Sequence, residues 1–202
     1  MANCSYLALG DSYTIGEQVL LSDSFPYQTI QLLRRYNKKF TFYAPEIIAK
    51  TGWTTDELAA AIEQTSFLPK YDFVSLLIGV NNQYRGRPVE NYIEEFELLL
   101  KKAIQLAGNH NKRVFVLSIP DWGITPFAAQ RDIDSIASAI DVFNSACKLI
   151  TDKFDCHYID ITTSLRADGK KADFIASDGL HPSGKEYAKW AAKLSEAISL
   201  SL

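Results

Sequence analysis

The feature that most constrains this chain is a regular alternation of short apolar runs with longer amphipathic segments. Runs rich in β-branched and aromatic residues predict strands over residues 6–9, 40–49, 73–78, 114–119 and 158–161. Segments with apolar residues three and four positions apart predict helices over residues 26–36, 55–65, 89–107, 133–153 and 184–199. Because parallel neighbours need a crossover connection, the alternation predicts an α/β fold with a doubly wound parallel sheet between two helical layers.

Local signals support some of the predicted helix ends. Thr54 with Glu57, and Ser183 with Glu186, have the spacing of a capping box at a helix start. The helix predicted over 133–153 is followed by no glycine terminator, so the sequence leaves its end open.

The length of the chain suits a single domain. Its 202 residues, 47% of them hydrophobic and 22% charged, can bury a sizeable core. No repeat, low-complexity tract or linker interrupts the alternation, and the longest irregular stretch, 121–131, is interpreted as a loop. We therefore expect one domain over residues 1–202.

The charge balance limits the classes of binding partner that we expect. The formal net charge is −3, and basic residues occur singly or in short clusters, such as those at 85–87 and 170–171. A phosphate backbone requires a basic footprint, so we do not expect a nucleic-acid partner. No stretch approaches the ~20 apolar residues of a membrane span, and the first predicted strand begins too early for a signal peptide. The sequence as given predicts a cytoplasmic protein, or a periplasmic or secreted one if a leader has been removed.

Neither a metal nor a cofactor is expected. Cys4, Cys147 and Cys156 are few, odd in number and without CxxC spacing, which argues against a disulfide framework or a structural zinc site. The histidines are far apart in sequence and no His-Glu-x-x-His occurs. Residues 10–16, which follow the first strand, lack the glycine pattern that cradles a phosphate.

Chemically useful residues follow four of the five predicted strands. Ser12 comes after the first, Gly52 after the second, Asn81 after the third, and Asp178 and His181 in the loop after the fifth. In open parallel sheets, ligands bind outside the carboxyl ends of the strands, all of which lie on one edge. The sequence therefore predicts that these five residues share one site.

These residue types have complementary roles in ester cleavage. The Ser12 hydroxyl needs a base, for which His181 is the best candidate, and Asp178 lies three residues before it, where a turn lets the carboxylate orient the ring. His110 lies in a polar turn and His157 begins the fifth strand, so we interpret both as surface or structural histidines.

An oxyanion needs hydrogen-bond donors, which we assign to the backbone N–H groups of Ser12 and Gly52 and to the side-chain amide of Asn81. Each residue also has an ordinary explanation, because Asp-Gly, glycine and asparagine are common in turns after strands. Their joint occurrence at four strand ends favours catalysis over coincidence.

The same residues carry a resemblance to a known family. Gly10-Asp11-Ser12, Gly52, Gly79-Val80-Asn81-Asn82 and Asp178-Gly179-Leu180-His181 resemble, in order, the four blocks of the SGNH hydrolases, also called GDSL esterases and lipases. The resemblance spans nearly the whole chain. It implies a flavodoxin-like five-stranded sheet of order 2-1-3-4-5 and cofactor-free hydrolysis of esters or thioesters through an acyl-enzyme.

Two positions depart from the family pattern. Tyr13 stands where the family has leucine, and Asn82 stands where it usually has aspartate. Tyr13 alters the wall beside the nucleophile, whereas Asn82 leaves open whether a neutral or a charged contact supports Asn81. Asp11 is interpreted as structural, hydrogen-bonded within its own turn.

Several side chains near the strand ends are candidates for substrate contact. The aromatic ones either line a pocket for an acyl chain or a sugar ring or pack locally under loops, and they are Tyr13, Trp53, Tyr84, Trp122 and Phe127. Arg85 and Arg87 either meet an anionic group of the substrate or are merely solvated.

The favoured function is a serine esterase acting on a small-molecule ester, an acylated sugar or a lipid. An acyltransferase with the same residues and a non-catalytic, carbohydrate-binding or flavodoxin-like module are the alternatives. Catalysis by a cysteine ranks last, because the thiols are predicted away from the strand carboxyl ends. Acyl length, leaving group and oligomeric state stay open.

Overall fold

A parallel sheet forms the centre of the molecule. The computed structural model describes residues 2–202. The sheet contains β2 (Tyr6–Asp11), β4 (Glu46–Lys50), β5 (Phe73–Leu77), β6 (Val114–Leu117) and β7 (His157–Ile159). Its order is β4-β2-β5-β6-β7, with every neighbouring pair parallel. Counted along the chain as the five predicted strands, this is the order 2-1-3-4-5 that the resemblance implies.

The central strands are buried on both faces. All residues of β2, β5 and β6 are buried, and Leu9 lies opposite Leu76 in the β2–β5 pairing. A parallel strand covered on both faces has no polar side to solvate, which explains why these runs are almost continuously apolar rather than alternating.

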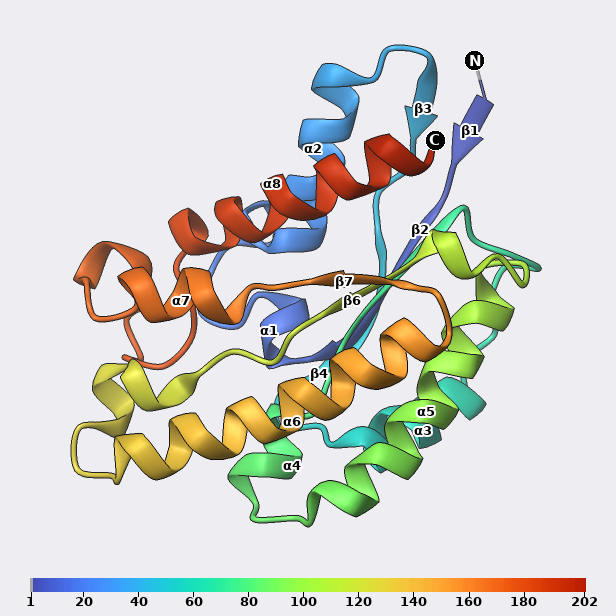
Figure 1. The fold of residues 1–202 in the computed structure, drawn as a ribbon. Coiled ribbons are helices and arrows are strands. Elements are labelled where there is room, and N and C mark those ends of the chain that lie inside the picture. The colour runs from blue at the N-terminus through green and yellow to red at the C-terminus, as the bar shows by residue number, and fades with distance from the viewer. Residues whose placement is uncertain (1) are drawn as a thin grey trace.

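Helices cover both faces of the sheet, as predicted. On one face α2 (Phe25–Tyr36) packs along α8 (Gly184–Ser201), and on the other lie α3 (Thr55–Glu63), α5 (Val89–Leu106) and α6 (Ile133–Lys153) (Figure 1). Phe25 of α2 lies against α8, with its ring centroid 6.2 Å from that of Trp190 and 6.4 Å from that of Tyr187. These amphipathic faces build the three-layer core.

Short elements complete the part of the chain that the structure describes, residues 2–202. Three are brief α-helices, namely α1 (Ser12–Ile15), α4 (Val80–Tyr84) and α7 (Thr162–Asp168). Five are 3₁₀ turns, at Leu21–Asp23, Asn111–Arg113, Trp122–Ile124, Pro126–Ala128 and Ala172–Phe174. None was predicted, because one or two helical turns are too short to show a period.

The strand predicted over residues 40–49 is wrong as a single element. It divides into β3 (Phe40–Phe42) and β4, with Pro45 between them. Proline has no backbone N–H to donate to a ladder, so the run cannot continue through it. β3 instead pairs with β1 (Ala2–Cys4) in a separate two-stranded sheet.

The helix starts follow the predicted signals in part. The Thr54–Glu57 capping box is present, with the Thr54 N–H donating to Glu57 Oε2 at 2.9 Å. At α8, Ser183 caps the helix, but Glu186 does not complete a box. Glu186 is fully buried and accepts hydrogen bonds from Trp190 Nε1 at 2.9 Å, from Ser164 at 2.7 Å and from Lys189 Nζ at 2.7 Å. These partners compensate the cost of burying its carboxylate.

The helix end that the sequence left open is settled by the backbone. The helix α6 ends at Lys153, and Asp155, two residues later, has a φ of 55°. Aspartate is one of the few residues other than glycine that tolerate this left-handed conformation.

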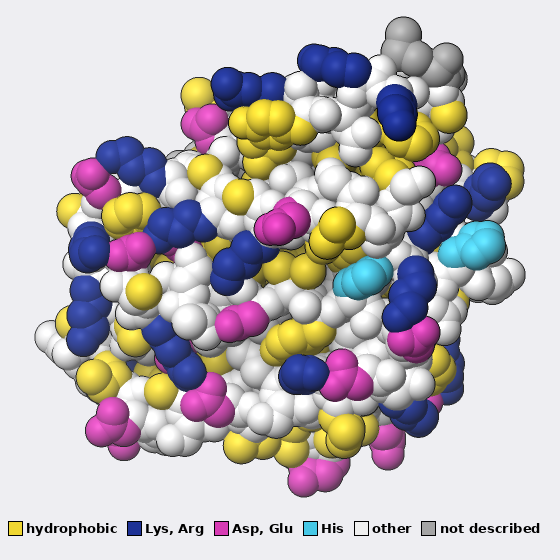
Figure 2. Space-filling model, turned by 45° about the horizontal axis from the view of Figure 1, so that its top comes forward, with side chains coloured by type: hydrophobic (Ala, Val, Ile, Leu, Met, Phe, Trp, Pro, Cys, Tyr) yellow, Lys and Arg dark blue, Asp and Glu magenta, His cyan; other side chains and the backbone are white. Residues whose placement is uncertain are grey.

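One face of the molecule is mixed in charge. On the face shown in Figure 2, Lys and Arg side chains are interspersed with Asp and Glu rather than gathered in one patch. Within residues 2–202, no helix is long and apolar enough to cross a membrane.

Candidate active site

One cavity collects most of the predicted site residues. It has a volume of about 200 Å³ and lies at the carboxyl ends of β2, β4 and β5. Ser12, Gly52, Asn81 and His181 all line it, although they come from four separate parts of the chain. Asp178 lies behind His181, to which it is hydrogen-bonded.

Ser12 lies at the junction of β2 and α1. It is 4% exposed and is the first residue of α1, where backbone N–H groups have no acceptor inside the helix. A Cβ atom on Gly10 would collide with the Leu77 carbonyl and with Thr14, so the chain can pass here only as glycine. This tight packing holds Ser12 at the cavity.

His181 links Ser12 to Asp178. Its Nε2 lies 3.0 Å from Ser12 Oγ, and its Nδ1 lies 2.5 Å from Asp178 Oδ2. The Asp178 carboxylate also accepts the backbone N–H groups of Leu180 and His181, both at 3.0 Å from Oδ1. The short turn over Gly179, with its φ of 72°, makes this three-residue contact possible.

The surroundings of Asp178 keep it ionised. Burial by itself would raise the pKa of this carboxyl, but hydrogen bonds from the His181 ring and from two backbone N–H groups outweigh it and hold the pKa below its ordinary value. Because an ionised carboxylate only accepts, the proton of the contact belongs to Nδ1 of His181. Nε2 is then free to accept the hydrogen of the Ser12 hydroxyl.

Gly52 and Asn81 face the cavity from the loop after β4 and from α4. Gly52 has a φ of 82°, a left-handed conformation that favours glycine, and its N–H has no acceptor among residues 2–202. Asn81 donates one amide hydrogen from Nδ2 to the Trp53 carbonyl at 3.0 Å, which leaves the other hydrogen of this group for a ligand.

Asn82 holds the first residue of α3, just after the loop that carries Gly52, through a neutral contact. The side chain is fully buried, accepts the Thr55 N–H at 3.1 Å and donates to Thr55 Oγ1 at 2.6 Å. The Thr55 hydroxyl in turn donates to Glu95. Aspartate could not donate to Thr55, so the amide determines the direction of this hydrogen-bond chain.

Asp11 is hydrogen-bonded within its own turn, as predicted. Oδ1 accepts the Tyr13 N–H at 3.0 Å, whereas the buried Oδ2 has no protein partner within the described residues. Burial raises the pKa of Asp11 to about 7. Asp11 does not line the cavity.

Aromatic residues form much of the cavity wall. Tyr13, Tyr84, Trp122 and Phe127 line it, and the Trp122 ring lies 5.2 Å from that of Tyr84 and 6.1 Å from that of Phe127. Trp53 does not line it, because its side chain packs against the core while only its carbonyl contacts Asn81.

Sequence reasoning missed three cavity residues, Thr51, Val80 and Leu180. All three adjoin a residue that was predicted, so their position beside Gly52, Asn81 and His181 was the available signal.

The two arginines are neither free nor simply solvated. Arg85 pairs with Glu57 at 3.3 Å, and Arg87 pairs with Asp56 at 2.6 Å. Neither lines the cavity, because each reaches back toward the loop before α3 and the first turn of that helix.

The remaining histidines and the thiols lie away from the cavity. His157 is in β7, where its ring stacks on Phe115, and His110 lies in the turn before β6. Burial raises the pKa of the Cys147 thiol to about 12 and that of Cys156 to about 11, so neither is a ready nucleophile. No cluster of side chains suited to holding a metal ion occurs in the described part of the chain.

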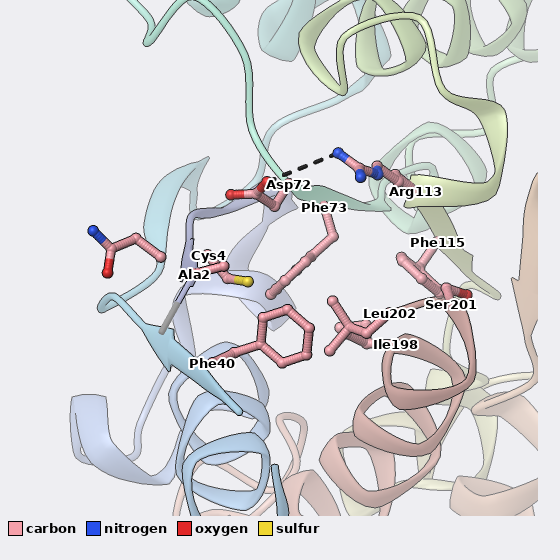
Figure 3. Close-up of a pocket in the computed structure, with 11 residues that line it drawn as sticks. Ala2, Cys4, Phe40, Asp72, Phe73, Arg113, Phe115, Ile198, Ser201 and Leu202 are labelled. Atoms are coloured by element: carbon pink, nitrogen blue, oxygen red, sulfur yellow. Dashed lines mark ion pairs between the residues drawn. The ribbon is translucent and has the colours of Figure 1, made fainter. Parts of the chain in front are cut away.

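A second cavity of about 180 Å³ lies at the other end of the sheet. Figure 3 shows Phe40, Phe73 and Ile198 around it, with the ion pair of Asp72 and Arg113 at its edge, 3.8 Å between Oδ1 and Nη1. Asp72 and Arg113 come just before strands β5 and β6, so this is the amino end. Its lining includes a serine and a cysteine but no histidine.

Comparisons with known proteins bear on the family and the fold of the chain. The model of the GDSL-like Lipase/Acylhydrolase family matches residues 8–189. A comparison with curated proteins found no match.

Among solved structures, a lipase/acylhydrolase from Enterococcus faecalis aligns with a TM-score of 0.74 at 18% identity, covering 98% of this chain and 95% of that one. The acetylxylan esterase Axe2 from Geobacillus stearothermophilus gives 0.74 at 18%, over 99% and 94%. The psychrotrophic esterase EstA from Pseudoalteromonas sp., solved inhibited by monoethylphosphonate, gives 0.68 at 18%, over 97% of each chain. At these identities the likeness concerns the fold.

Proposed function

Because the chain belongs to the GDSL-like lipase/acylhydrolase family, we propose that it is a serine esterase that hydrolyses carboxylic esters or thioesters through an acyl-enzyme. The observation that carries this proposal is the hydrogen-bond chain from Ser12 Oγ through the His181 ring to Asp178, with links of 3.0 and 2.5 Å, at the wall of an open cavity. This is the geometry that activates a serine hydroxyl.

In the first half of the reaction, His181 Nε2 takes the hydroxyl proton as Ser12 Oγ attacks the acyl carbon. Asp178 holds the ring in the tautomer that leaves Nε2 free, and it stabilises the imidazolium that forms. The tetrahedral intermediate then collapses. The bond to the leaving oxygen or sulfur breaks, and His181 returns the proton to that atom.

Three donors stabilise the oxyanion of this intermediate. They are the N–H groups of Ser12 and Gly52 and the Nδ2 amide of Asn81, all of which belong to residues that line the cavity. Such donors act on charge that develops only in the transition state, so each contributes about 3 kcal/mol to lowering the barrier.

In the second half, water replaces the leaving group. His181 removes a proton from the water, the hydroxide attacks the acyl carbon, and the Ser12 oxygen leaves with the proton from His181. No cofactor enters either half of this scheme.

The walls of the cavity favour an uncharged acyl group. The side chains that line it beyond the proposed catalytic ones are aromatic, aliphatic or hydroxylic, and none is charged. An apolar cavity of about 150 Å³ holds benzene, so about 200 Å³ suits a short acyl chain. Tyr84 and Phe127, 47% and 43% exposed, offer ring faces at the opening on which a sugar or lipid leaving group can pack.

The first test is hydrolysis of a p-nitrophenyl ester series, from acetate to long acyl chains, by the wild type and Ser12→Ala in parallel. We expect turnover that falls with chain length and is lost in Ser12→Ala. Adding alcohols or sugars separates the acyltransferase alternative, because an acceptor that outcompetes water yields a new ester.

Labelling with a fluorophosphonate provides a second readout that needs no correct leaving group. EstA was solved inhibited by monoethylphosphonate. In this chain, an activated serine should react with a fluorophosphonate to form a phosphonyl ester at Ser12. A wild type that neither hydrolyses any ester nor is labelled would contradict the proposal and favour a binding module.

A further inference from the structure

The loop between β4 and α3 presents the Gly52 N–H to the cavity, yet its own backbone is poorly suited to hold a fixed geometry. Glycine adopts many conformations, and Gly52, which is half-buried, has a φ of 82° in its turn. A donor stabilises a transition state well only if it is already aimed at the oxyanion, since reorganisation costs part of the gain. Within the loop, one backbone hydrogen bond closes the turn, from the Trp53 N–H to the Lys50 carbonyl at 3.2 Å. Contacts from outside the loop must supply the rest of the restraint on this peptide.

Three side chains from one short segment, residues 81–85, supply these contacts. Arg85 Nη2 donates to the Gly52 carbonyl at 2.6 Å. Asn81 donates to the next carbonyl, that of Trp53, at 3.0 Å, and Asn82 accepts the N–H of Thr55 at 3.1 Å. Just before Gly52 in the chain, the Thr51 hydroxyl donates to Glu17, which follows α1, the helix that begins at Ser12.

The Arg85 guanidinium is itself oriented. It lies 3.3 Å from Glu57, whose carboxylate also accepts the Thr54 N–H at 2.9 Å. Both side chains of this ion pair are more than 40% exposed, so the pair adds little to stability. The hydrogen bond from the Arg85 cation to the Gly52 carbonyl is charge-assisted, which is a stronger class of hydrogen bond. It restrains the peptide unit that directly follows the one carrying the Gly52 N–H.

We propose that Arg85 is a positioning residue for the oxyanion donors: it holds the Gly52 carbonyl and thereby keeps the Gly52 N–H and the Asn81 amide converging on one point. This inference rests on the proposed function. Arg85 does not line the cavity, so it acts through Gly52 and not on the substrate.

The proposal predicts a change in kcat rather than in KM. Donors that act in the transition state leave ground-state binding nearly unchanged. Losing one donor outright costs about 10²- to 10³-fold in kcat, and a donor that is present but misaimed keeps part of its effect. We therefore expect about a tenfold fall in kcat for Arg85→Ala, with an unchanged KM.

Arg87→Ala is the matched control. Arg87 pairs with Asp56 at 2.6 Å in the same region, but it bonds to no carbonyl of the loop. Both variants lose one arginine and one surface ion pair. The measurements are kcat and KM on the best p-nitrophenyl ester, the inhibition constant of an alkyl boronic acid, which mimics the tetrahedral intermediate, and recovery of kcat with millimolar methylguanidinium.

A tenfold loss of kcat and of boronic acid affinity in Arg85→Ala, restored by methylguanidinium and absent from Arg87→Ala, would support the positioning role. Equal behaviour of the two variants would overturn it. A raised KM with an unchanged kcat would also overturn it, because Arg85 would then bind substrate.

Wild-type turnover and fluorophosphonate labelling of Ser12 are measured in parallel. If the wild type is neither active nor labelled, the proposed function fails and the positioning role with it. If the wild type is active and labelled, a negative result for Arg85→Ala overturns the positioning role alone.

Discussion

The two ends of the sheet offer an instructive comparison. Each has a cavity of similar size, about 200 Å³ at the carboxyl end and about 180 Å³ at the amino end, and each is walled by aromatic rings. Of the two, the carboxyl-end cavity brings a serine hydroxyl within 3.0 Å of a histidine ring, in the contact of Ser12 with His181. Shape and apolarity alone do not make a reactive site; what differs is the chemistry that the loops after the strands deliver.

A carboxylate lies at or behind each cavity, yet the two are used differently. Asp178 accepts hydrogen bonds from a histidine ring that itself faces a serine hydroxyl. Asp72 accepts the N–H and the hydroxyl of Ser5, at 2.8 and 3.0 Å, and lies near Arg113. The first carboxylate belongs to a hydrogen-bond chain that leads to a serine hydroxyl, for which we propose a role in proton transfer. The second joins the starts of neighbouring strands.

The largest effect is expected at the carboxyl end, from removing His181, the proposed base. His181→Ala should lower kcat at least ~10³-fold, because the Ser12 hydroxyl then has no group to take its proton. Ester hydrolysis and far-UV circular dichroism measure the loss and the intact fold. His110→Ala, an exposed histidine in a turn, is the control and should keep full activity. Unchanged hydrolysis by His181→Ala would refute the assignment of the base.

Removing the side-chain oxyanion donor should have the next largest effect. Asn81→Ala should lower kcat about 10²-fold or more while KM changes little, because the amide is proposed to act on the transition state. Steady-state kinetics with one ester separates the two constants. A KM that rises while kcat holds would instead make Asn81 a substrate-binding residue.

At the amino end, a cavity-enlarging substitution should affect stability alone. Phe73 is 2% exposed and its ring lies 5.2 Å from that of Tyr6. Phe73→Leu should cost about 1 to 2 kcal/mol of unfolding free energy with an unchanged kcat/KM. Denaturant unfolding and ester hydrolysis measure the two. Loss of activity in a folded variant would show that the amino-end cavity communicates with Ser12.

Asp11 is expected to make stability depend on pH. Its folded pKa, about 7, lies above the ordinary aspartate value, so the folded state binds the extra proton and stability falls as pH rises from about 4 to 7. The side chain introduced in the Asp11→Asn variant carries no charge. The melting temperature of Asp11→Asn minus that of the wild type should therefore increase as the pH rises through this window. A difference that stays constant across the window would contradict the raised pKa.

The smallest effect is expected from the ion pair at the amino end. Arg113 and Asp72 are partly exposed and 3.8 Å apart, and such pairs contribute about 0 to 1 kcal/mol. Arg113→Ala should therefore leave both kcat/KM and the melting temperature nearly unchanged. A clear fall in kcat/KM would contradict the view that only the carboxyl end of the sheet takes part in ester hydrolysis.

Much of this molecule could be predicted from local patterns. The alternation of strand and helix indicated the layers, and the position of Ser12, Gly52 and Asn81 after successive strands indicated that they would meet at one edge. These predictions worked because hydrophobic period and strand-end position are properties of a few neighbouring residues, and because parallel strands carry their carboxyl ends to the same side.

Other features depended on contacts that no local pattern reports. The run over residues 40–49 divides at Pro45, and β3 pairs with β1. Glu186 points inward because Trp190 and Ser164 donate hydrogen bonds to its carboxylate. Trp53 has the same kind of position as Tyr84, yet it packs against the core while Tyr84 lines the cavity.

The sequence by itself therefore determined the layered α/β architecture and the residue types at the carboxyl edge of the sheet. Only the tertiary structure decided which side chains bond to one another. His181 meets Ser12 across 169 positions of the chain, and Arg85 meets Gly52 across 33. The physical reason is that a hydrogen bond depends on a separation of about 3 Å between two atoms, which only the packing of the whole fold establishes.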